Sequence, residues 1–123
     1  MTEITTVVDT YLAALSEADP AARTDQVKAA WTDDAHFVDP LLEASGHDEI
    51  AGLADAVTAQ FPGHAFRRTT GVDAHHDLVR FAWELVGPDG TVAATGLDVA
   101  VVAPDGRLAR VAGFFGEPPA KDE

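Results

Sequence analysis

The 123-residue chain contains no cysteine, a single tyrosine, and only eight lysine and arginine residues against 21 aspartate and glutamate residues. Without cysteine, disulfide bonds, thiolate metal sites and cysteine nucleophiles are excluded. The formal net charge of −13 would repel a phosphate backbone or an anionic membrane surface, so we expect neither nucleic acid nor a membrane as a partner. The acidic side chains are spread along the chain, which indicates a solubilising surface.

The chain also lacks a long apolar run, and its first twenty residues, MTEITTVVDTYLAALSEADP, lack a basic start. We therefore expect neither a signal peptide nor a membrane span, and a cytoplasmic location. What the chain does have is 46% hydrophobic residues, enough to form one buried core at this length. We expect a single domain over residues 1–117 and a loose C-terminal tail, PPAKDE, over residues 118–123.

Hydrophobic periodicity predicts three helices in the first half of the chain. Apolar residues recur at helical spacing over residues 4–18. Asp19-Pro20 then supplies an N-cap and a proline suited to the first helical position, so a second helix is expected over residues 20–31. A third is expected over residues 46–61, ended by Pro62-Gly63. The predicted buried positions are Ile4, Val7, Val8, Tyr11, Leu12, Leu15, Val27, Ala30, Trp31, Ile50, Leu53, Ala54, Val57 and Phe61.

The period of the pattern changes from 3.6 to 2 in the second half, which indicates strands. In HDLVRFAWELV (residues 76–86) two sets of side chains alternate, Val79, Phe81, Trp83 and Leu85 on one face and Leu78, Arg80, Ala82 and Glu84 on the other. Turn signals at residues 88–90 and 104–106 separate further strands near residues 91–103 and 107–116. A strand near residues 64–73 and a short segment at residues 35–39 complete the prediction. Three helices followed by an antiparallel meander correspond to the α+β fold class.

This order of elements, with its motifs, resembles the nuclear transport factor 2-like (NTF2-like) superfamily, and within it the SnoaL-like and ketosteroid isomerase branch. The motifs are YLAAL in the first helix, WTDDAHFVDP after the second, GHDEI at the start of the third, GLDVAVVAPDGRL in the late strands and FFGE at the end. The resemblance implies a cone-shaped fold, in which three N-terminal helices pack on a curved mixed, mostly antiparallel sheet that encloses a pocket. It does not fix the activity, because this fold carries isomerases, cyclases, dehydratases, epoxide hydrolases and proteins without catalysis.

Three residues match the positions of the catalytic groups of steroid isomerases. Asp39 matches their general base, the aspartate of a DP pair after the second helix, and Tyr11 matches their oxyanion-stabilising tyrosine in the first helix. Asp98, in GLDVA, matches their protonated aspartate in the next-to-last strand. Because Tyr11 is the only tyrosine here, the further tyrosines that support it in some relatives have no counterpart.

The residue types themselves allow this chemistry and also simpler roles. Moving a double bond beside a carbonyl needs a base for a C–H proton and donors for the enolate oxygen, and a carboxylate, a tyrosine or a neutral carboxylic acid can serve. Asp39 before Pro40 equally suits an Asx-turn, and Tyr11 on an apolar face equally suits a core aromatic. Asp98 stands in TVAATGLDVAVVA, the least charged stretch of the chain, where a carboxylate must be paired or protonated.

Aromatic and branched side chains are expected to form the wall of the pocket. The predicted ligand-contacting residues are Trp83, Phe81, Phe61, Phe115, Trp31 and Val79, although core packing alone would also explain them. No role is predicted for His64, His75 or His76. Adjacent residues of a strand point to opposite faces and no metal-binding motif is present, so no metal site is predicted. Ser45 lacks the context of a hydrolase nucleophile, and GHDEIAG lacks a phosphate-loop pattern.

Together these patterns favour a small enzyme that binds a mostly apolar carbonyl compound, steroid-like or polyketide-like, and catalyses base-assisted isomerisation or cyclisation without a cofactor. One alternative is a ligand-binding or assembly module that keeps the pocket and lacks the chemistry. Another is an epoxide hydrolase-like enzyme, which would require Arg80 to share a cavity with Asp98. The resemblance also implies a homodimer through the outer face of the sheet, where Arg80 either meets the second subunit or pairs with Glu84; the contact would include Leu78, Arg80, Ala82 and Glu84.

Overall fold

Three helices and seven strands make up the part of the chain that the computed structural model describes, residues 3–122. The helices are α1 (Ile4–Ala14), α2 (Pro20–Ala30) and α3 (Gly46–Gln60). The strands are β1 (Trp31–Val38), β2 (Glu43–Ser45), β3 (Ala65–Arg68), β4 (Asp73–His75), β5 (Leu78–Val86), β6 (Val92–Val102) and β7 (Leu108–Phe115). Within residues 3–122 no helix is long and apolar enough to cross a bilayer.

Local sequence signals account for the helix boundaries. The Asp19 carboxylate accepts a hydrogen bond from the backbone N–H of Ala21 at 3.2 Å, and Pro20 occupies the first turn of α2, as predicted. Asp48 and Glu49 lie in the first turn of α3, where their negative charge interacts favourably with the positive end of the helix dipole. The first helix ends at Ala14, earlier than its apolar pattern indicated, and the third ends one residue earlier.

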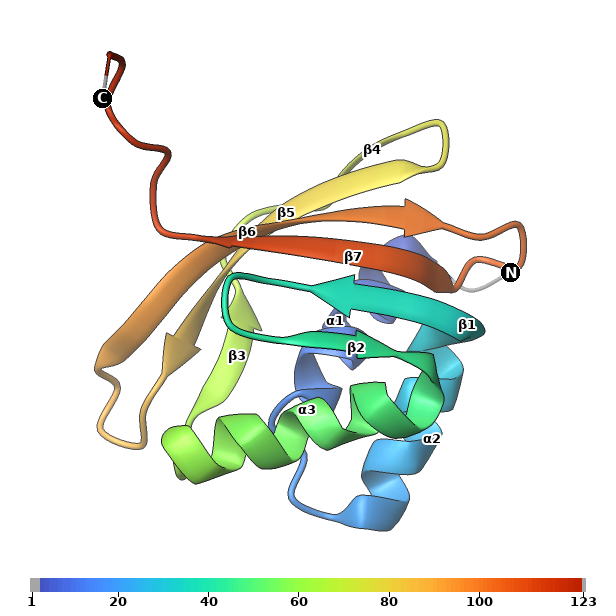
Figure 1. Cartoon of the computed structure of the whole chain (residues 1–123), viewed down its shortest axis with the longest axis horizontal. Helices are drawn as coiled ribbons and strands as arrows, with labels where there is room; N and C mark the ends of the chain where they lie inside the picture. Colours follow the sequence, from blue (N-terminus) through green and yellow to red (C-terminus); the bar gives the residue numbers. More distant parts are fainter. Residues whose placement is uncertain (1–2, 123) are drawn as a thin grey trace.

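The strands form one mixed sheet in the order β2-β1-β7-β6-β5-β3, and β4 also pairs with β5. Only the β1–β7 pair is parallel among the described strands, and the other pairs are antiparallel. The sheet bends strongly and the three helices gather on one side of it, while the residues after β7 run away from the body (Figure 1). This is the predicted α+β cone, with its interior between the helices and the inward face of β5, β6 and β7.

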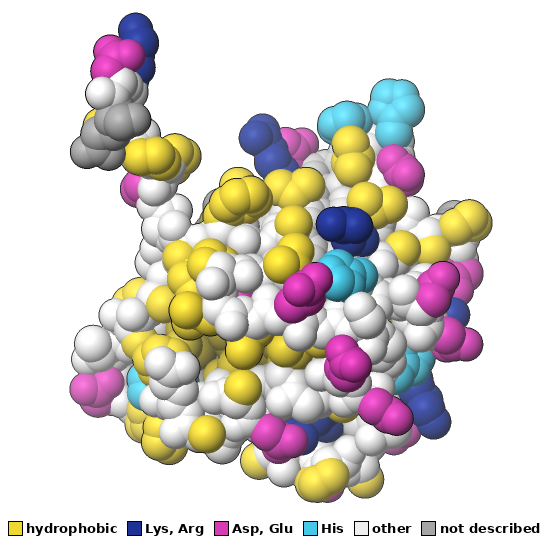
Figure 2. Space-filling model, viewed as in Figure 1, with side chains coloured by type: hydrophobic (Ala, Val, Ile, Leu, Met, Phe, Trp, Pro, Cys, Tyr) yellow, Lys and Arg dark blue, Asp and Glu magenta, His cyan; other side chains and the backbone are white. Residues whose placement is uncertain are grey.

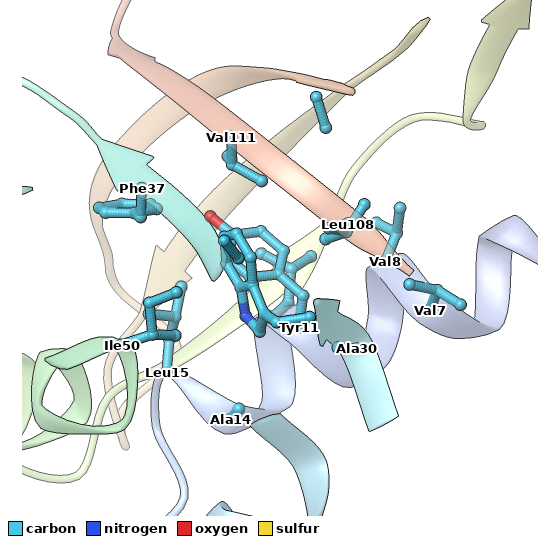
Figure 3. Packing of buried hydrophobic residues seen from close by; sticks show 14 of the residues in the cluster. Val7, Val8, Tyr11, Ala14, Leu15, Ala30, Phe37, Ile50, Leu108 and Val111 are labelled. Carbon is cyan, nitrogen blue, oxygen red and sulfur yellow. The ribbon is translucent and has the colours of Figure 1, made fainter. Parts of the chain in front are cut away.

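The core lies in that interior and is centred on Tyr11. Its ring packs edge-on against Trp31 at 5.3 Å and against Phe81 at 6.2 Å between ring centroids. All three side chains are at most 2% exposed. Figure 3 shows Tyr11 amid the buried cluster, with its hydroxyl oxygen directed toward the side of Phe37 and Val111.

The structure corrects three predictions about local structure. Trp31 does not end the second helix but begins β1, because its extended backbone pairs with Leu108 of β7, a long-range contact that overrides local helical spacing. The single strand expected at residues 64–73 is two strands, β3 and β4, that pair with different parts of β5. Arg80 does not pair with Glu84.

Cross-strand geometry explains that last difference. Four residues along one strand span about 13 Å, whereas directly opposite residues lie about 5 Å apart. Arg80 is opposite Asp73 of β4 and pairs with it at 2.7 Å, while Glu84 is opposite Arg67 of β3 and pairs with that residue. The alternation of β5 is otherwise as predicted: Val79, Phe81, Trp83 and Leu85 are buried, and their neighbours in the strand are more exposed.

Candidate functional site

A carboxylate lies in the apolar interior of the sheet. The buried positions of β6 are Gly96, Asp98 and Ala100, and Asp98 is only 2% exposed. It lies opposite Phe81 of β5 and Gly113 of β7 in the strand register. A buried charge of this kind needs donors or protonation, as the sequence already indicated for this position.

Two side chains supply the donors, one for each oxygen of the carboxyl group. The Tyr11 hydroxyl donates to Oδ2 of Asp98 at 2.6 Å, from α1. The Trp83 indole Nε1–H donates to Oδ1 at 2.9 Å, from β5. The structure therefore brings Tyr11 and Asp98, two of the three predicted catalytic residues, into direct contact, and adds Trp83 in a role that the sequence did not suggest.

The environment shifts the protonation equilibria of this pair. The pKa of Asp98 is raised to about 6, chiefly by burial and also by the nearby Asp39 carboxylate, while the hydrogen bonds from Tyr11 and Trp83 act in the opposite direction. Burial, followed by the charge of Asp98, raises the pKa of Tyr11 well above its usual value. Tyr11 is therefore a hydroxyl donor at neutral pH, and Asp98 changes its charge close to neutrality.

Asp39 lies in the turn that follows β1. Its Oδ1 accepts the backbone N–H groups of Leu41 and Leu42, both at 2.8 Å, which is the Asx-turn considered above. Within residues 3–122 no hydrogen bond engages its Oδ2. Asp39 also lines the same pocket as Tyr11 and Asp98, so the turn and the pocket-facing position occur together.

Two glycines allow these groups to come close. A Cβ atom on Gly113 would lie 2.8 Å from Oδ1 of Asp98 and 3.3 Å from Cβ of Asp39, so the two carboxylate side chains flank the same glycine. A Cβ atom on Gly96 would overlap the Trp83 indole, which lies over that glycine. Sequence reasoning missed both glycines, since a strand glycine shows its purpose only once the facing residues are known.

The pocket is a cavity of about 120 Å³ with a mostly apolar wall. Of the predicted ligand-contacting residues, Trp83, Phe61 and Phe115 line it. Phe81, Trp31 and Val79 are buried but lie outside this lining. The further residues of its wall are Leu12, Leu15, Phe37, Leu41, Leu42, Leu53, Ala56, Val57, Gln60, Phe66, Leu85 and Ala94.

The remaining candidates lie elsewhere. Arg80 points away from the cavity, with a side chain that is 66% exposed, so it forms no relay with Asp98. His64, His75 and His76 do not line the pocket, and Nδ1 of His75 lies 3.0 Å from Nδ1 of His76 on the surface.

The structure also joins Ser45, His36 and Glu43 in a chain that the sequence did not predict. The Ser45 hydroxyl lies 2.7 Å from Nδ1 of His36, whose Nε2 lies 2.9 Å from Oε2 of Glu43. These residues are cross-strand neighbours on β1 and β2 and do not line the pocket. Ser45 directly precedes α3, whose first turn is acidic. The negative charge of that turn would destabilise an oxyanion formed beside Ser45. We therefore interpret the three hydrogen-bonded side chains as polar pairing between two strands.

Comparison with known proteins identifies the family. The profile described as "SnoaL-like domain" matches residues 8–111. The chain belongs to the SnoaL-like family. This confirms the resemblance drawn from the sequence motifs. No functionally curated protein matches the chain.

Solved structures agree with this assignment. A protein from Agrobacterium tumefaciens str. C58, named a "putative isomerase of the SnoaL-like family", is 38% identical over 95% of this SnoaL-like chain and 100% of its own, with a TM-score of 0.86. A protein from Sinorhizobium meliloti, named a "putative polyketide cyclase", is 18% identical over 91% of this chain and 99% of its own, with a TM-score of 0.67. A protein with a ketosteroid isomerase-like fold from Catenulispora acidiphila DSM 44928, solved in complex with trimethylamine, is 14% identical over 89% of this chain and 85% of its own, with a TM-score of 0.72. The last two likenesses concern the fold alone.

Proposed function

We propose that this SnoaL-like protein binds a mostly apolar carbonyl compound, steroid-like or polyketide-like, and isomerises or cyclises it without a cofactor, with Asp39 as the base. The observation that carries the proposal is that Asp39 and Asp98 line one apolar pocket in contrasting environments. One carboxylate lies in a turn with an unengaged oxygen, and the other is buried between two donors. Pairs of carboxylates whose environments differ in this way are suited to separate acid and base tasks.

The chain's own residues suffice for a proton shift. Oδ2 of Asp39 takes the proton from the carbon beside the carbonyl and returns it to another carbon, while Oδ1 stays held by the turn. Negative charge that develops on the substrate oxygen is stabilised by the Tyr11 hydroxyl. The apolar wall excludes water, which strengthens that hydrogen bond. A ring closure begins with the same proton removal: the carbanion forms a C–C bond to a second carbonyl carbon, the π electrons of that carbonyl move to its oxygen, and this oxygen takes the proton from Asp39.

The contrasting possibility is a binding module without chemistry. The complex of the Catenulispora protein with trimethylamine shows that this fold can hold a small molecule. A binding module has no need of a base next to the bound ligand, whereas an enzyme does. We therefore test turnover with a small β,γ-unsaturated cyclohexenone and with a β,γ-unsaturated 3-ketosteroid, following the ultraviolet band of the conjugated enone. Conjugation of either compound supports the enzyme, and binding of both without conjugation supports the module.

We also propose that the protein is a homodimer through the outer face of the sheet. Leu97, Val99 and Phe114 are 37%, 38% and 60% exposed on neighbouring strands β6 and β7. Figure 2 shows hydrophobic side chains gathered over the strand layer on the face in view. Leu97 lies opposite Ala82 and Val99 opposite Arg80, so this patch continues onto the predicted contact residues of β5. Exposed apolar patches of this kind are typical of subunit contacts.

A further inference from the structure

Each oxygen of the Asp98 carboxyl group already has a hydrogen-bond donor. Oδ2 accepts from the Tyr11 hydroxyl and Oδ1 accepts from the Trp83 indole. The two donors differ in kind, because an indole N–H can only donate, whereas a phenol hydroxyl can donate or accept. A proton therefore joins Asp98 more favourably at Oδ2, where the hydrogen bond with Tyr11 can reverse, than at Oδ1, where it would make that oxygen a weaker acceptor for the Trp83 N–H.

Packing holds the Trp83 indole in this position. Its ring lies over Gly96, where a side chain would overlap it, and meets Phe66 and Phe115 edge-on at 5.1 Å and 6.0 Å between centroids. The residue is only 6% exposed. A donor fixed on several sides cannot follow a moving partner, so its hydrogen bond selects one arrangement of Asp98.

Resting on the function proposed above, we propose that Trp83 is a positioning residue that keeps the proton of neutral Asp98 on Oδ2, so that Asp98 turns the Tyr11 hydroxyl toward the ligand. When Asp98 is ionised, Tyr11 donates its hydrogen to Oδ2 and none is left for a ligand. When Asp98 is protonated, its own O–H donates to the Tyr11 oxygen, and the Tyr11 hydrogen is free to point into the pocket that Tyr11 lines. Asp98 thus acts on the ligand only through Tyr11.

The groups that face Asp98 set the pH at which this exchange occurs. They are Tyr11 from α1, Trp83 from β5 and Asp39 from the turn after β1, while β7 presents Gly113, which does not titrate. Burial and Asp39 raise the pKa of Asp98 to about 6 despite the two donors. Tyr11, whose pKa is raised well above its usual value, keeps its hydrogen throughout this range.

The first test measures the protonation of Asp98 directly, by the carbon-13 chemical shift of its carboxyl group between pH 4.5 and 8. The variants are Trp83→Phe, which keeps an aromatic ring but removes the N–H, and Trp31→Phe as the matched control, since no bond joins Trp31 to Asp98. Removing a donor to the carboxylate should raise the midpoint by about one pH unit in Trp83→Phe, and Trp31→Phe should leave it in place. An unmoved midpoint in Trp83→Phe would overturn the proposal.

The second test asks whether the Tyr11 hydrogen is released. The probe is 1-tetralone, an apolar ketone whose oxygen can only accept a hydrogen bond, and its affinity is measured by calorimetry across the same pH range. We expect binding to strengthen about tenfold from pH 8 to pH 5, a change equal to one hydrogen bond. The gain in affinity at low pH should shrink in Trp83→Phe, because the proton of Asp98 is then no longer confined to Oδ2, and the profile should be flat in Tyr11→Phe.

These outcomes separate this inference from the function on which it rests. A flat profile in the unaltered protein, or no binding of 1-tetralone at any pH, would overturn the inference even if the enones are conjugated. A pH-dependent affinity that follows the Asp98 midpoint would support it even if neither enone is conjugated, in which case only the proposed isomerisation fails.

Discussion

The Tyr11 hydroxyl and Oδ2 of Asp98 are joined by a buried 2.6 Å hydrogen bond across 87 residues of sequence. It links the first helix to the next-to-last strand through the centre of the core, and it also forms one wall of the pocket. The stability of the fold and the proposed function therefore depend on the same contact.

Tyr11→Phe should lower the free energy of unfolding by about 1–3 kcal/mol, because Asp98 loses a buried donor. The loss should be larger at pH 8 than at pH 5, since the removed hydrogen bond favours the ionised form of Asp98. Urea denaturation at the two pH values measures the difference. Equal losses at both would contradict the described role of the hydroxyl.

Gly113→Ala should destabilise the protein by about 1–3 kcal/mol, because the added methyl group would lie 2.8 Å from Oδ1 of Asp98 and 3.3 Å from Cβ of Asp39. Affinity for a ketone probe should fall as well, since the carboxylates are forced apart. Gly52→Ala is the matched control: no atom lies within 4 Å of the added group on the exposed side of α3, and helix propensity predicts a gain of about 0.5–1 kcal/mol. Thermal or urea unfolding measures the change in stability of both variants. Equal changes in the two variants would contradict the packing described around Gly113.

Ionisation of Asp98 should cost stability as the pH rises. The folded state holds this proton up to a pH of about 6, while the unfolded chain releases it near the ordinary value of 3.8. The free energy of unfolding relative to Asp98→Asn should therefore fall by roughly 2 kcal/mol between pH 4 and pH 7. Unfolding curves of both proteins at several pH values measure this. A difference that is constant with pH would show that Asp98 is not buried as described.

Phe114→Glu should convert the proposed homodimer to a monomer, because it introduces charge into the exposed patch around Leu97 and Val99. Ala59→Glu, an exposed position on α3, is the control and should leave the dimer intact. Analytical ultracentrifugation gives the mass of each. The proposed interface would be contradicted if the unaltered protein were monomeric at high micromolar concentration. It would also be contradicted if the Phe114→Glu variant remained a dimer.

The sequence predicted the features that follow from local pattern. The alternation of β5 identified its buried face, the Asp19-Pro20 pair marked the start of α2, and a carboxylate in an uncharged strand singled out Asp98. In each case the signal lies within a few residues, where the spacing of apolar positions and the energetic penalty of burying charge determine the outcome.

What could not be predicted depends on residues that meet only in the fold. Trp31 begins a strand because β7, more than 70 positions later, offers a parallel partner. Gly96 and Gly113 allow close approach only because Trp83, Asp98 and Asp39 face them. The hydrogen bond from Trp83 to Asp98 likewise needs the register of β5 and β6, which no periodicity specifies.

The most direct test of the proposed chemistry is the turnover of a β,γ-unsaturated ketone by Asp39→Asn beside the unaltered protein. Asparagine keeps the Oδ1 acceptor for the N–H groups of Leu41 and Leu42, so the turn survives and the free energy of unfolding should change by less than about 1 kcal/mol. It removes the base, so kcat should fall by about 10²- to 10⁴-fold. A variant that is equally stable and retains turnover within about threefold of the unaltered protein would reduce Asp39 to a turn residue and contradict the proposed mechanism.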